Sequence, residues 1–506
     1  MKLKSPGKRT IRSLVVTGVA LASVTGMVLA QSPAMADPTV TYVAVGSDTI
    51  QDVMNAFASS LGGNLLGSYN ATNPTTQTIG EVITPAKTGI TTSTNQIASE
   101  NCSFNRPDGS TQGNEALRAS LSGTSSAGGT TTTASDIPGE AIAIGSSTGN
   151  LPANLPQQNC VDIGRSSSAL SSTDLDANNG YLLYVPFALD AVTTGIGPSA
   201  AIAPTTANAN NVNLPVGCTV GSSTDPCVTI PESNLASTLA GVGFSQASLT
   251  AMYNSGDDGI AETTTGTSGT CYAPYGGGAP DTPPSGFTCT TTIPVDLYIP
   301  QPGSGTLSFW ASQTGNWSST SPPKWDYQTI QPDLGPTGTP ETLPQFYTAT
   351  QGAGGLAANP VQVEEHDGTA VSVDPNGIFP MSVAQYIAQH NGHDPRYHGM
   401  QITPVSGVEP TTGAAPGTLN TAFPITRNVF NIVAYDRVVN TNDGNYDPIL
   451  SQMLVTSTAN GTSLLCADKA LIEQYGFGLL TSAPLGQTCG EVDTAADRGY
   501  GPSTGF

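Results

Sequence analysis

The spacing of apolar residues changes from strand-like to helical within residues 41–57. Residues 41–45 form a short apolar run that is typical of a buried strand. Residues 50–57 then carry apolar side chains at positions that fall on one face of a helix. Ser47 or Asp48 stands where a helix-capping residue is expected. The segment therefore predicts a strand, a tight turn and a helix.

The same alternation of strand-like and helical segments recurs along the chain. Buried strands are predicted at 181–188, 293–299 and 429–434, and helices after Ser110 and at 248–253, 381–389 and 467–475. Stretches rich in Thr, Gly, Pro and Ser are predicted to be long surface loops, at 122–138, 201–226, 255–290 and 311–342. Strands that alternate with helices favour an α/β architecture over a β-sandwich.

The first 36 residues have the composition of an export signal. Five lysines and arginines precede an apolar run over 14–30, and Ala34-Met35-Ala36 follows as an A-x-A cleavage site. An uncleaved membrane anchor is the alternative, but Gly18 and Gly26 make the run a poor membrane span. We therefore expect a secreted, extracellular protein without stable membrane insertion.

The chain is strongly acidic, with 15 basic and 37 acidic residues and a formal charge of −22. Cleavage of the signal removes five basic residues and makes the mature chain still more negative. This charge argues against nucleic acids and anionic lipid surfaces as partners. It does not exclude a small anion held in a cleft, because local dipoles dominate at short range.

Eight cysteines remain after the signal, which suggests up to four disulfides in an exported protein. Pairing between neighbours along the sequence is our expectation, and no C-x-x-C motif indicates a zinc or redox site. The expected pairs are Cys102 with Cys160, Cys218 with Cys227, Cys271 with Cys289, and Cys466 with Cys489.

Four short clusters of Gly, Ser and Thr stand where helices are expected to begin. The first N–H groups of a helix have no acceptor within the helix and lie at the positive end of its dipole, so they hold an oxyanion without a lysine. A single cluster of this kind is more often a helix cap. Several that converge predict an oxyanion-binding cleft. The clusters are Gly46-Ser47-Asp48-Thr49, Gly109-Ser110-Thr111, Gly164-Arg165-Ser166-Ser167-Ser168 and Gly303-Ser304-Gly305-Thr306.

Six segments that include these clusters occur in the order found in one protein family. The chain resembles the phosphate-binding proteins of bacterial ABC transporters, the PstS-like group with a type II periplasmic-binding-protein fold. The matching segments span most of the mature chain and read VGSDTIQDVM (45–54), FNRPDGSTQGNEALRASL (104–121), VDIGRSSSAL (161–170), VPFALDAV (185–192), PGSGTLSFW (302–310) and FPITRNVFNIV (423–433).

The resemblance implies an α/β, two-lobed fold that closes on its ligand without chemistry. The long Thr/Gly/Pro-rich loops are then surface additions. The implied first lobe combines residues 37–190 and 396–506, and the second lobe is 191–395. An ABC permease complex in the membrane is the partner that the resemblance implies.

The resemblance also implies a set of ligand contacts at the Gly/Ser/Thr clusters. Asp48, within the first of them, is predicted to be a helix cap or a surface acid. The implied contacts are Ser47 and Thr49 in the first loop, Ser110 in the second, and Ser304, Gly305 and Thr306 in the far lobe, where the family has an SGT motif.

Two positions depart from the family pattern, one in the third loop and one before the SGT motif. Ser167 stands where the family often has an Asp that accepts the proton of hydrogen phosphate, and Pro300 stands where it often has an Arg. Ser166 and Ser167 remain candidate donors to the ligand. Arg165 lies in the same loop, and we hypothesise that it replaces the missing charge.

Two classes of function are therefore open. The first is a secreted solute-binding protein that captures an oxyanion, with phosphate favoured, and that diffuses freely or is retained by the cell wall. The second is a surface or adhesion-type protein that uses the same fold to bind glycans or proteins. The long loops, the missing Asp and Arg and the absence of a lipid-anchor cysteine favour the second class.

Weaker motifs point to a secreted hydrolase or a metal site. Residues 145–149 match a nucleophile elbow, but residues 150–153 disfavour the helix that must follow it. Residues 390–398 hold three histidines and an aspartate in a turn, so these side chains lack a common helical face. Residues 364–367 are interpreted as a polar loop or hinge segment. We expect no catalytic residues, no metal and no cofactor.

Overall fold

The computed structural model describes most of the chain after the predicted signal. The predicted signal, the loop at 201–226 with Cys218, the neighbouring Cys227, and the elbow motif at 145–149 lie outside the described residues. The described residues are 39–74, 80–88, 99–122, 132–134, 140–142, 156, 159–172, 174–176, 180–198, 235–239, 241–274, 283–301, 303–317, 362–373, 377–439, 441–481, 487–492 and 497–499.

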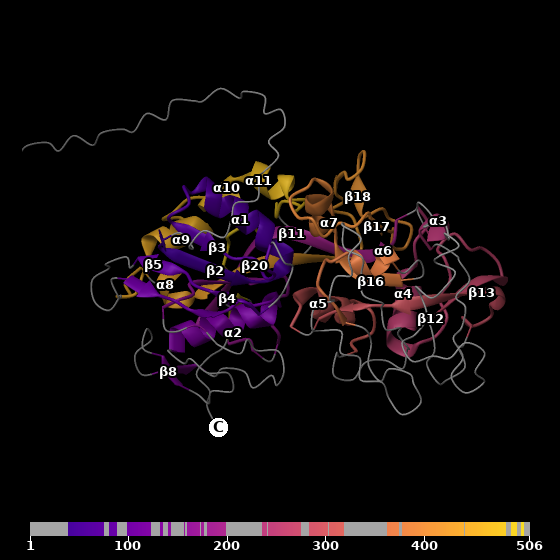
Figure 1. Ribbon diagram of the computed structural model, residues 1–506, viewed down its shortest axis with the longest axis horizontal. Helices are drawn as coiled ribbons and strands as arrows, with labels where there is room; N and C mark the ends of the chain where they lie inside the picture. The colour runs from indigo at the N-terminus through magenta and orange to yellow at the C-terminus, as the bar shows by residue number, and fades with distance from the viewer. Residues whose placement is uncertain are drawn as a thin grey trace, which may run out of the picture. The chain divides into compact units, whose positions relative to one another are not determined.

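A mixed sheet of ten strands organises these residues (Figure 1). Parallel pairs stand at both ends of the strand order, and antiparallel pairs join them in the middle. The order is β12 (Ser268–Pro274), β13 (Thr288–Leu297), β16 (Gly377–Ser382), β11 (Leu182–Ile196), β20 (Thr426–Ala434), β10 (Ile163–Ser166), β2 (Tyr42–Gly46) and β3 (Leu66–Ser68), with β17 (Gln401–Ile402) and β21 (Arg498–Gly499) also paired to β11.

Short strand pairs and a small three-stranded sheet complete the β-structure of the described residues. The small sheet has the order β1 (Thr39–Val40), β5 (Ala86–Thr88) and β6 (Ser99–Asn101), and the pairs are β4 (Val82–Ile83) with β7 (Phe104–Asn105), β8 (Thr132–Ala134) with β9 (Glu140–Ile142), β14 (Ile299–Pro300) with β15 (Gln362–Val363), and β18 (Thr411–Thr412) with β19 (Thr418–Leu419).

Strand β2 shows why one end of the sheet needs helices on both faces. Tyr42 and Ala44 pack in one hydrophobic cluster, whereas Val43 and Val45 pack in another. Successive side chains of a strand point to opposite faces, so an apolar run with no polar alternation is buried on both. The first cluster is covered by α1 (Gln51–Ser60), α9 (Pro448–Leu454), α10 (Leu464–Ala467) and α11 (Lys469–Gln474), and the second by α2 (Gly109–Ser122).

A third hydrophobic cluster lies around the other end of the sheet. Trp310 is fully buried at its centre, with its ring centroid 5.5 Å from that of Tyr253. Its helices are α3 (Leu235–Leu239), α4 (Gln246–Thr250), the following π turn η2 (Ala251–Ser255), α5 (Gly305–Gln313), α6 (Thr369–Val373) and α7 (Val383–His390). No helix among the described residues is long and apolar enough to cross a bilayer.

Strand β11 passes from the first pair of clusters to the third. All 15 of its residues are buried; its side chains that pack in the first two clusters end at Ala188, and those that pack in the third begin at Leu189. Separate cores joined by long central strands make the fold α/β and two-lobed, as the sequence predicts. The lobe boundaries near 190 and 395 stay a prediction.

Most predicted elements are found, and the predicted loops contain the main differences. The predicted helix over 467–475, for example, is found as α11, and the strand over 181–188 extends to Ile196 in β11. The stretch 255–290 is wrong as a loop, because it contains β12 and the start of β13. Their outer residues are exposed threonines and serines, so this pair lacks the apolar alternation that identifies a strand.

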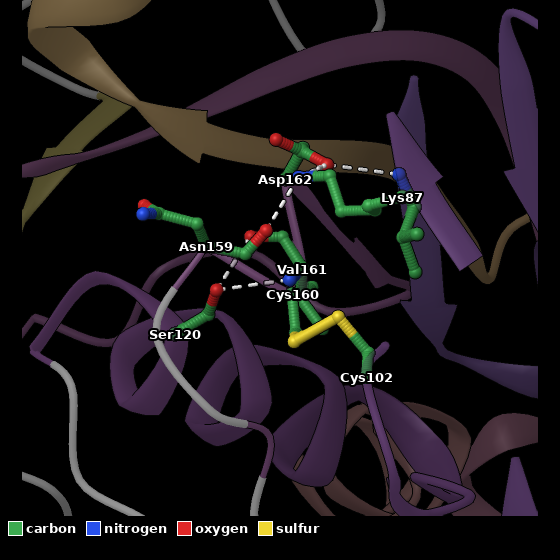
Figure 2. Close-up of a disulfide and its surroundings, with 8 residues drawn as sticks. Lys87, Cys102, Ser120, Asn159, Cys160, Val161 and Asp162 are labelled. Atoms are coloured by element: carbon green, nitrogen blue, oxygen red, sulfur yellow. Dashed lines mark hydrogen bonds and ion pairs between the residues drawn. A yellow bond between two sulfur atoms is a disulfide. The ribbon is translucent and has the colours of Figure 1, made fainter. Parts of the chain in front are cut away.

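Three of the four expected disulfides are present: Cys102–Cys160, Cys271–Cys289 and Cys466–Cys489. The fourth expected pair lies outside the described residues. Figure 2 shows Cys102–Cys160 beside the ion pair of Lys87 with Asp162. This part of the fold is thus held by covalent, ionic and apolar contacts together.

Candidate functional site

The buried carboxylate of Glu365 accepts hydrogen bonds from two Gly/Ser/Thr clusters that are far apart in the sequence. Its Oε1 accepts hydrogen bonds from Thr49 Oγ1 at 2.8 Å and from Thr306 Oγ1 at 2.5 Å. Thr49 belongs to the 3-10 turn η1 (Asp48–Ile50) that precedes α1, and Thr306 to the first turn of α5. Both hydroxyls and the carboxylate are fully buried. The first and fourth Gly/Ser/Thr clusters therefore meet at one oxygen atom.

Arg427 supplies the positive charge behind these hydroxyls. Its Nη2 donates to Thr306 Oγ1 at 2.8 Å and to Thr49 Oγ1 at 3.3 Å. The guanidinium is held by Asp190, which stands opposite Arg427 in the β11–β20 register and accepts from its Nε at 3.0 Å and Nη2 at 2.8 Å. Its Nη1 is buried and has no partner among the described residues. One further donor atom is thus available at this position.

His366 completes the group, which we call the Glu365 site: Thr49, Thr306, Glu365, His366 and Arg427. Its Nε2 lies 3.0 Å from both Glu365 Oε1 and Thr49 Oγ1. Its Nδ1 accepts from the amide of Ser382 at 3.4 Å, so in a neutral ring the proton is on Nε2. A ring in that form donates to Glu365 and cannot take a proton from Thr49, which argues against nucleophilic catalysis by this threonine.

The backbone of His366 is strained, and contacts with neighbouring side chains hold it in this conformation. Its φ is 64°, in the left-handed region that side chains other than glycine rarely adopt. Such strain costs of order 1 kcal/mol or more and persists only where the surroundings fix it. Here Gln389 Nε2 donates to the His366 carbonyl at 2.7 Å, and Arg396 Nη1 donates to the Glu365 carbonyl at 3.1 Å.

The surroundings of Glu365 favour its ionised form. Burial by itself raises the pKa of this carboxyl, but His366, Thr306 and Arg427 outweigh burial and bring the pKa well below its usual range. Its second oxygen, Oε2, is buried without a partner among the described residues. The site is therefore a set of donors that stabilises an anionic oxygen, with one oxygen of that anion left unsatisfied.

The second, third and fourth clusters meet beside the Glu365 site. Ser110 Oγ accepts from the amide of Ser167 at 3.0 Å and lies 3.3 Å from its hydroxyl. A Cβ built on Gly305 would lie 2.4 Å from both hydroxyl oxygens, so only glycine fits there. Gly303 accepts from the amide of Thr111 at 3.1 Å. Loops that begin α2 and α5 thus touch directly.

The remaining predicted hydroxyls have different surroundings. Ser304 is the N-cap of α5 and accepts from the amide of Leu307 at 3.1 Å. Ser166 donates to the carbonyl of Ser168 at 2.8 Å. Ser47 Oγ is fully buried with no partner among the described residues. Of the predicted residues, Thr49 and Thr306 thus meet at Glu365, whereas Ser110, Ser167 and Gly305 meet beside it.

Arg165 is placed differently from our hypothesis. Its Nη1 donates to Ser68 Oγ at 2.8 Å, and its Nη2 donates to the carbonyl oxygens of Gly46 and Tyr69. Burial lowers the pKa of Arg165 to about 9, although nearby carboxylates act against this shift. The guanidinium supports the backbone of the first loop. The arginine that contacts Thr49 and Thr306 is Arg427.

Asp48 is also placed differently from our prediction of a cap or a surface acid. It is fully buried, and both of its oxygens accept from Arg396, at 2.6 and 2.8 Å. Arg396 also binds Asp394. The prediction is wrong because Arg396 arrives from a segment 348 residues away, which no local pattern near Asp48 indicates.

A second pair of buried acids, Asp108 and Glu364, is bridged by Gln301 rather than by an arginine. Gln301 Nε2 donates to both oxygens of Asp108 at 3.2 Å and to Glu364 Oε1 at 3.5 Å. Burial, followed by the charges of Asp48 and Glu365, raises the pKa of Asp108 to about 8. Asp108 is therefore predominantly protonated at neutral pH, which lowers the negative charge around the site.

The residues of this region that the sequence analysis does not identify have only weak signals along the chain. Glu365 and His366 lie in the run 364–367, which is interpreted as a polar loop or hinge. The charged residues of that run do not by themselves indicate burial. Arg427 and Asp190 are single charges inside otherwise buried strands. A charge inside a buried strand is costly unless it is paired, so the two together were a usable signal.

No metal site is supported within the described part of the chain. The one group of three close potential ligands there is Asp258, Cys271 and Cys289. The two cysteines form a disulfide, so they offer no thiolate. Asp394, near the histidines at 390–398, instead pairs with Arg396.

Comparison with known proteins gives distant structural likenesses only. No family model and no curated protein matches the chain. A phosphate ABC transporter substrate-binding protein with bound phosphate from Clostridium perfringens is 10% identical, with a TM-score of 0.34, over 86% of this chain and 98% of that chain. An ABC-type phosphate transport receptor from Vibrio cholerae is 10% identical, with a TM-score of 0.34, over 87% and 99%. PstS from Borrelia burgdorferi is 10% identical, with a TM-score of 0.29, over 87% and 98%. These scores are too low to carry an argument about the site.

Proposed function

We propose that this protein is an exported solute-binding protein that holds a small oxyanion at the Glu365 site. The single observation that supports this most is the convergence of Thr49, Thr306 and His366 on one anionic oxygen. These groups come from three separate segments, and nothing in their local structure requires them to meet. Hydrogen bonds to a charged group contribute about 1.5–3 kcal/mol each, so a few of them suffice for micromolar affinity.

Phosphate is the oxyanion we propose. Its several oxygens match a site in which hydroxyls, a guanidinium and helix N-termini lie close together. The amides of Gly305 and Thr306, at the start of α5, have no acceptor within their own helix and add to these donors. The Ser110 and Ser167 hydroxyls lie against Gly305 and extend the donor set.

The two-lobed arrangement suggests how the ligand is enclosed. Thr49 lies by the first pair of hydrophobic clusters, and Thr306 lies by the third. A ligand bound to both favours the closed arrangement of the two lobes. We propose no reaction on the ligand. The three disulfides fit an exported protein, and an ABC permease is the partner suggested by the sequence resemblance.

Calorimetric titration with phosphate, sulfate and vanadate tests this proposal. The wild-type protein should bind phosphate with a Kd in the micromolar range, and Thr306→Val should weaken binding at least tenfold. Thr193→Val is the matched control. Thr193 is likewise a buried threonine, and its hydroxyl donates to the carbonyl of Thr403, but it lies outside the Glu365 site. Its affinity should equal that of the wild type.

One observation favours the alternative of an adhesion-type protein that binds glycans or proteins. The donors of the Glu365 site already hold a carboxylate of the chain itself, and Asp48, Asp108 and Glu364 are buried nearby. A purely structural network would have this composition. If none of the three oxyanions produced heat on titration or shifted the melting temperature of the folded protein, that alternative would be supported.

A further inference from the structure

Glu365 lies where an external oxyanion would have to bind. Its Oε1 takes the hydrogen bonds of Thr49 and Thr306, the two hydroxyls that the proposed function assigns to the ligand. A second anion cannot use these donors at the same time, because each hydroxyl has one proton to donate and Glu365 accepts both. Ligand binding at this position therefore requires that the carboxylate leave.

We propose that Glu365 is a built-in competitor that occupies the donor set when no ligand is bound and that sets the affinity of the site. This inference rests on the proposed function of oxyanion binding at the same residues. An incoming anion takes over the bonds from Thr49 and Thr306, and the Glu365 side chain rotates away. The observed affinity is then the intrinsic affinity of the donors reduced by the stability of the internal contact.

Asp190 shows what a permanent buried carboxylate looks like in this protein. Its Oδ1 accepts from Ser382 Oγ at 2.8 Å and from the Ala384 amide at 3.2 Å, and its Oδ2 accepts twice from Arg427. Both oxygens are therefore satisfied. Glu365 has all its contacts on one oxygen, and its buried Oε2 has no partner among the described residues. A side chain held by one oxygen is the easier one to displace.

The backbone around Glu365 is fixed, so a change can be confined to the side chain. The Glu365 carbonyl accepts from Arg396 at 3.1 Å, and the next carbonyl, that of His366, accepts from Gln389 at 2.7 Å. Arg396 is itself held by Asp48 and Asp394. Rotation about the side-chain bonds of Glu365 exchanges the anion without breaking these backbone contacts.

Calorimetric titration of inorganic phosphate into Glu365→Ala and Glu365→Gln tests the inference. We expect both variants to bind phosphate at least tenfold more tightly than the wild type. Asp258→Asn is the control, because it removes the charge of a buried carboxylate outside the Glu365 site, and it should bind like the wild type. The glutamine variant retains the shape of the side chain in case the alanine variant does not fold.

A second measurement uses formate as a probe of the vacated position. Formate is a free carboxylate and should bind to Glu365→Ala, raise its melting temperature and compete with phosphate. It should do none of this with the wild type, in which the position is filled. Formate binding confined to the variant supports the inference even if the wild type fails to bind phosphate.

Two results would overturn the inference, and they separate it from the proposed function. Phosphate binding that is equal or weaker in both Glu365 variants, with binding intact in the wild type, leaves oxyanion binding standing and removes the competitor. A failure of every variant to bind phosphate, sulfate or formate removes both.

Discussion

Two buried carboxylates of this protein, Asp162 and Glu365, differ in how completely they are paired. Asp162 Oδ1 accepts from Arg437 at 2.7 Å, and its Oδ2 accepts from Lys87 at 2.8 Å and from the Val43 amide at 2.9 Å (Figure 2 shows the Lys87 contact). Glu365 uses one oxygen only. Asp162 lies beside the Cys102–Cys160 disulfide, whereas Glu365 lies between segments that belong to different hydrophobic clusters.

The difference separates a contact that holds the fold from the one for which we propose exchange with a ligand. Each acid is fully buried, and the pKa of each is lowered by its partners against the opposing effect of burial. For Asp162 the partners are two cations and an amide, and Arg437 also pairs with Asp447. For Glu365 they are His366, Thr306 and Arg427, groups that can also stabilise an external anion. Low pKa alone therefore does not identify a functional carboxylate.

The largest expected effect is the loss of stability in Asp162→Ala. Breaking a buried ion pair leaves Lys87 as an uncompensated charge and Arg437 with Asp447 as its only paired acid among the described residues, which costs about 3–5 kcal/mol. Chemical denaturation followed by circular dichroism measures it. Glu473→Gln, at an exposed position on α11, is the control and should change stability by less than about 0.5 kcal/mol. A loss in Asp162→Ala that is no larger than in this control would contradict the structural assignment.

The pH dependence of Asp162 has a defined sign. Its pKa is lower in the folded than in the unfolded protein, so the carboxylate contributes stability above the ordinary aspartate pKa of about 3.9. This contribution is lost as the pH falls through the folded value. Asp162→Asn should therefore show a flatter fall in the free energy of unfolding below pH 4 than the wild type. Parallel curves for the two proteins would argue against it.

Glu365→Ala should destabilise the ligand-free protein less, by about 2 kcal/mol, because buried hydroxyl donors lose their acceptor. Saturating phosphate should recover this loss, since a ligand at one hundred times its Kd adds about 2.7 kcal/mol. Asp162→Ala retains Glu365, so at the same phosphate concentration it should gain about 1.4 kcal/mol less, the equivalent of tenfold weaker binding. Thermal melts with and without phosphate compare the two variants. An equal shift in both would remove the distinction between the carboxylates.

Asp108→Asn should have a smaller effect, and with the opposite dependence on pH. The pKa of Asp108 is raised to about 8 in the folded protein, so the folded state holds its proton more tightly than the unfolded state. Wild-type stability therefore decreases as the pH rises from about 4 to about 8. Asp108→Asn should gain at least ~1.4 kcal/mol relative to the wild type over that range, the equivalent of one pKa unit. Unfolding at pH 5 and pH 8 measures the difference, and a pH-independent difference would contradict it.

The smallest expected effects come from two serines of the same helix, α2. Ser110 Oγ accepts from the amide of Ser167 in the candidate site, and Ser120 Oγ accepts from the amide of Val161 near the disulfide, at 3.0 and 2.9 Å (Figure 2 shows the second contact). Ser120→Ala should lower stability by about 1 kcal/mol without affecting phosphate affinity. Ser110→Ala should weaken phosphate binding several-fold. Equal phosphate affinities in the two variants would place Ser110 outside the ligand contacts.

The sequence alone determined the local structure and its chemistry. Apolar spacing over 41–57 gave the strand and helix around the first loop, and Gly, Ser and Thr marked the start of α2 and α5, because capping and helical periodicity depend on residues a few positions apart. Three disulfides joined sequence neighbours as expected. The strand pair β12–β13 is not predicted from the sequence, because its polar residues show no apolar alternation.

Only the tertiary structure decided which charges meet the hydroxyls. Thr49 is 316 residues from Glu365 and 378 from Arg427, so their contacts depend on strand register and loop path. The register of β11 with β20 sets Asp190 against Arg427, and the turn after β15 brings Glu365 to Thr306. Arg165, equally plausible by its place in a loop, is directed to the backbone instead. Side-chain destinations of this kind are fixed by long-range packing, which short patterns along a chain do not encode.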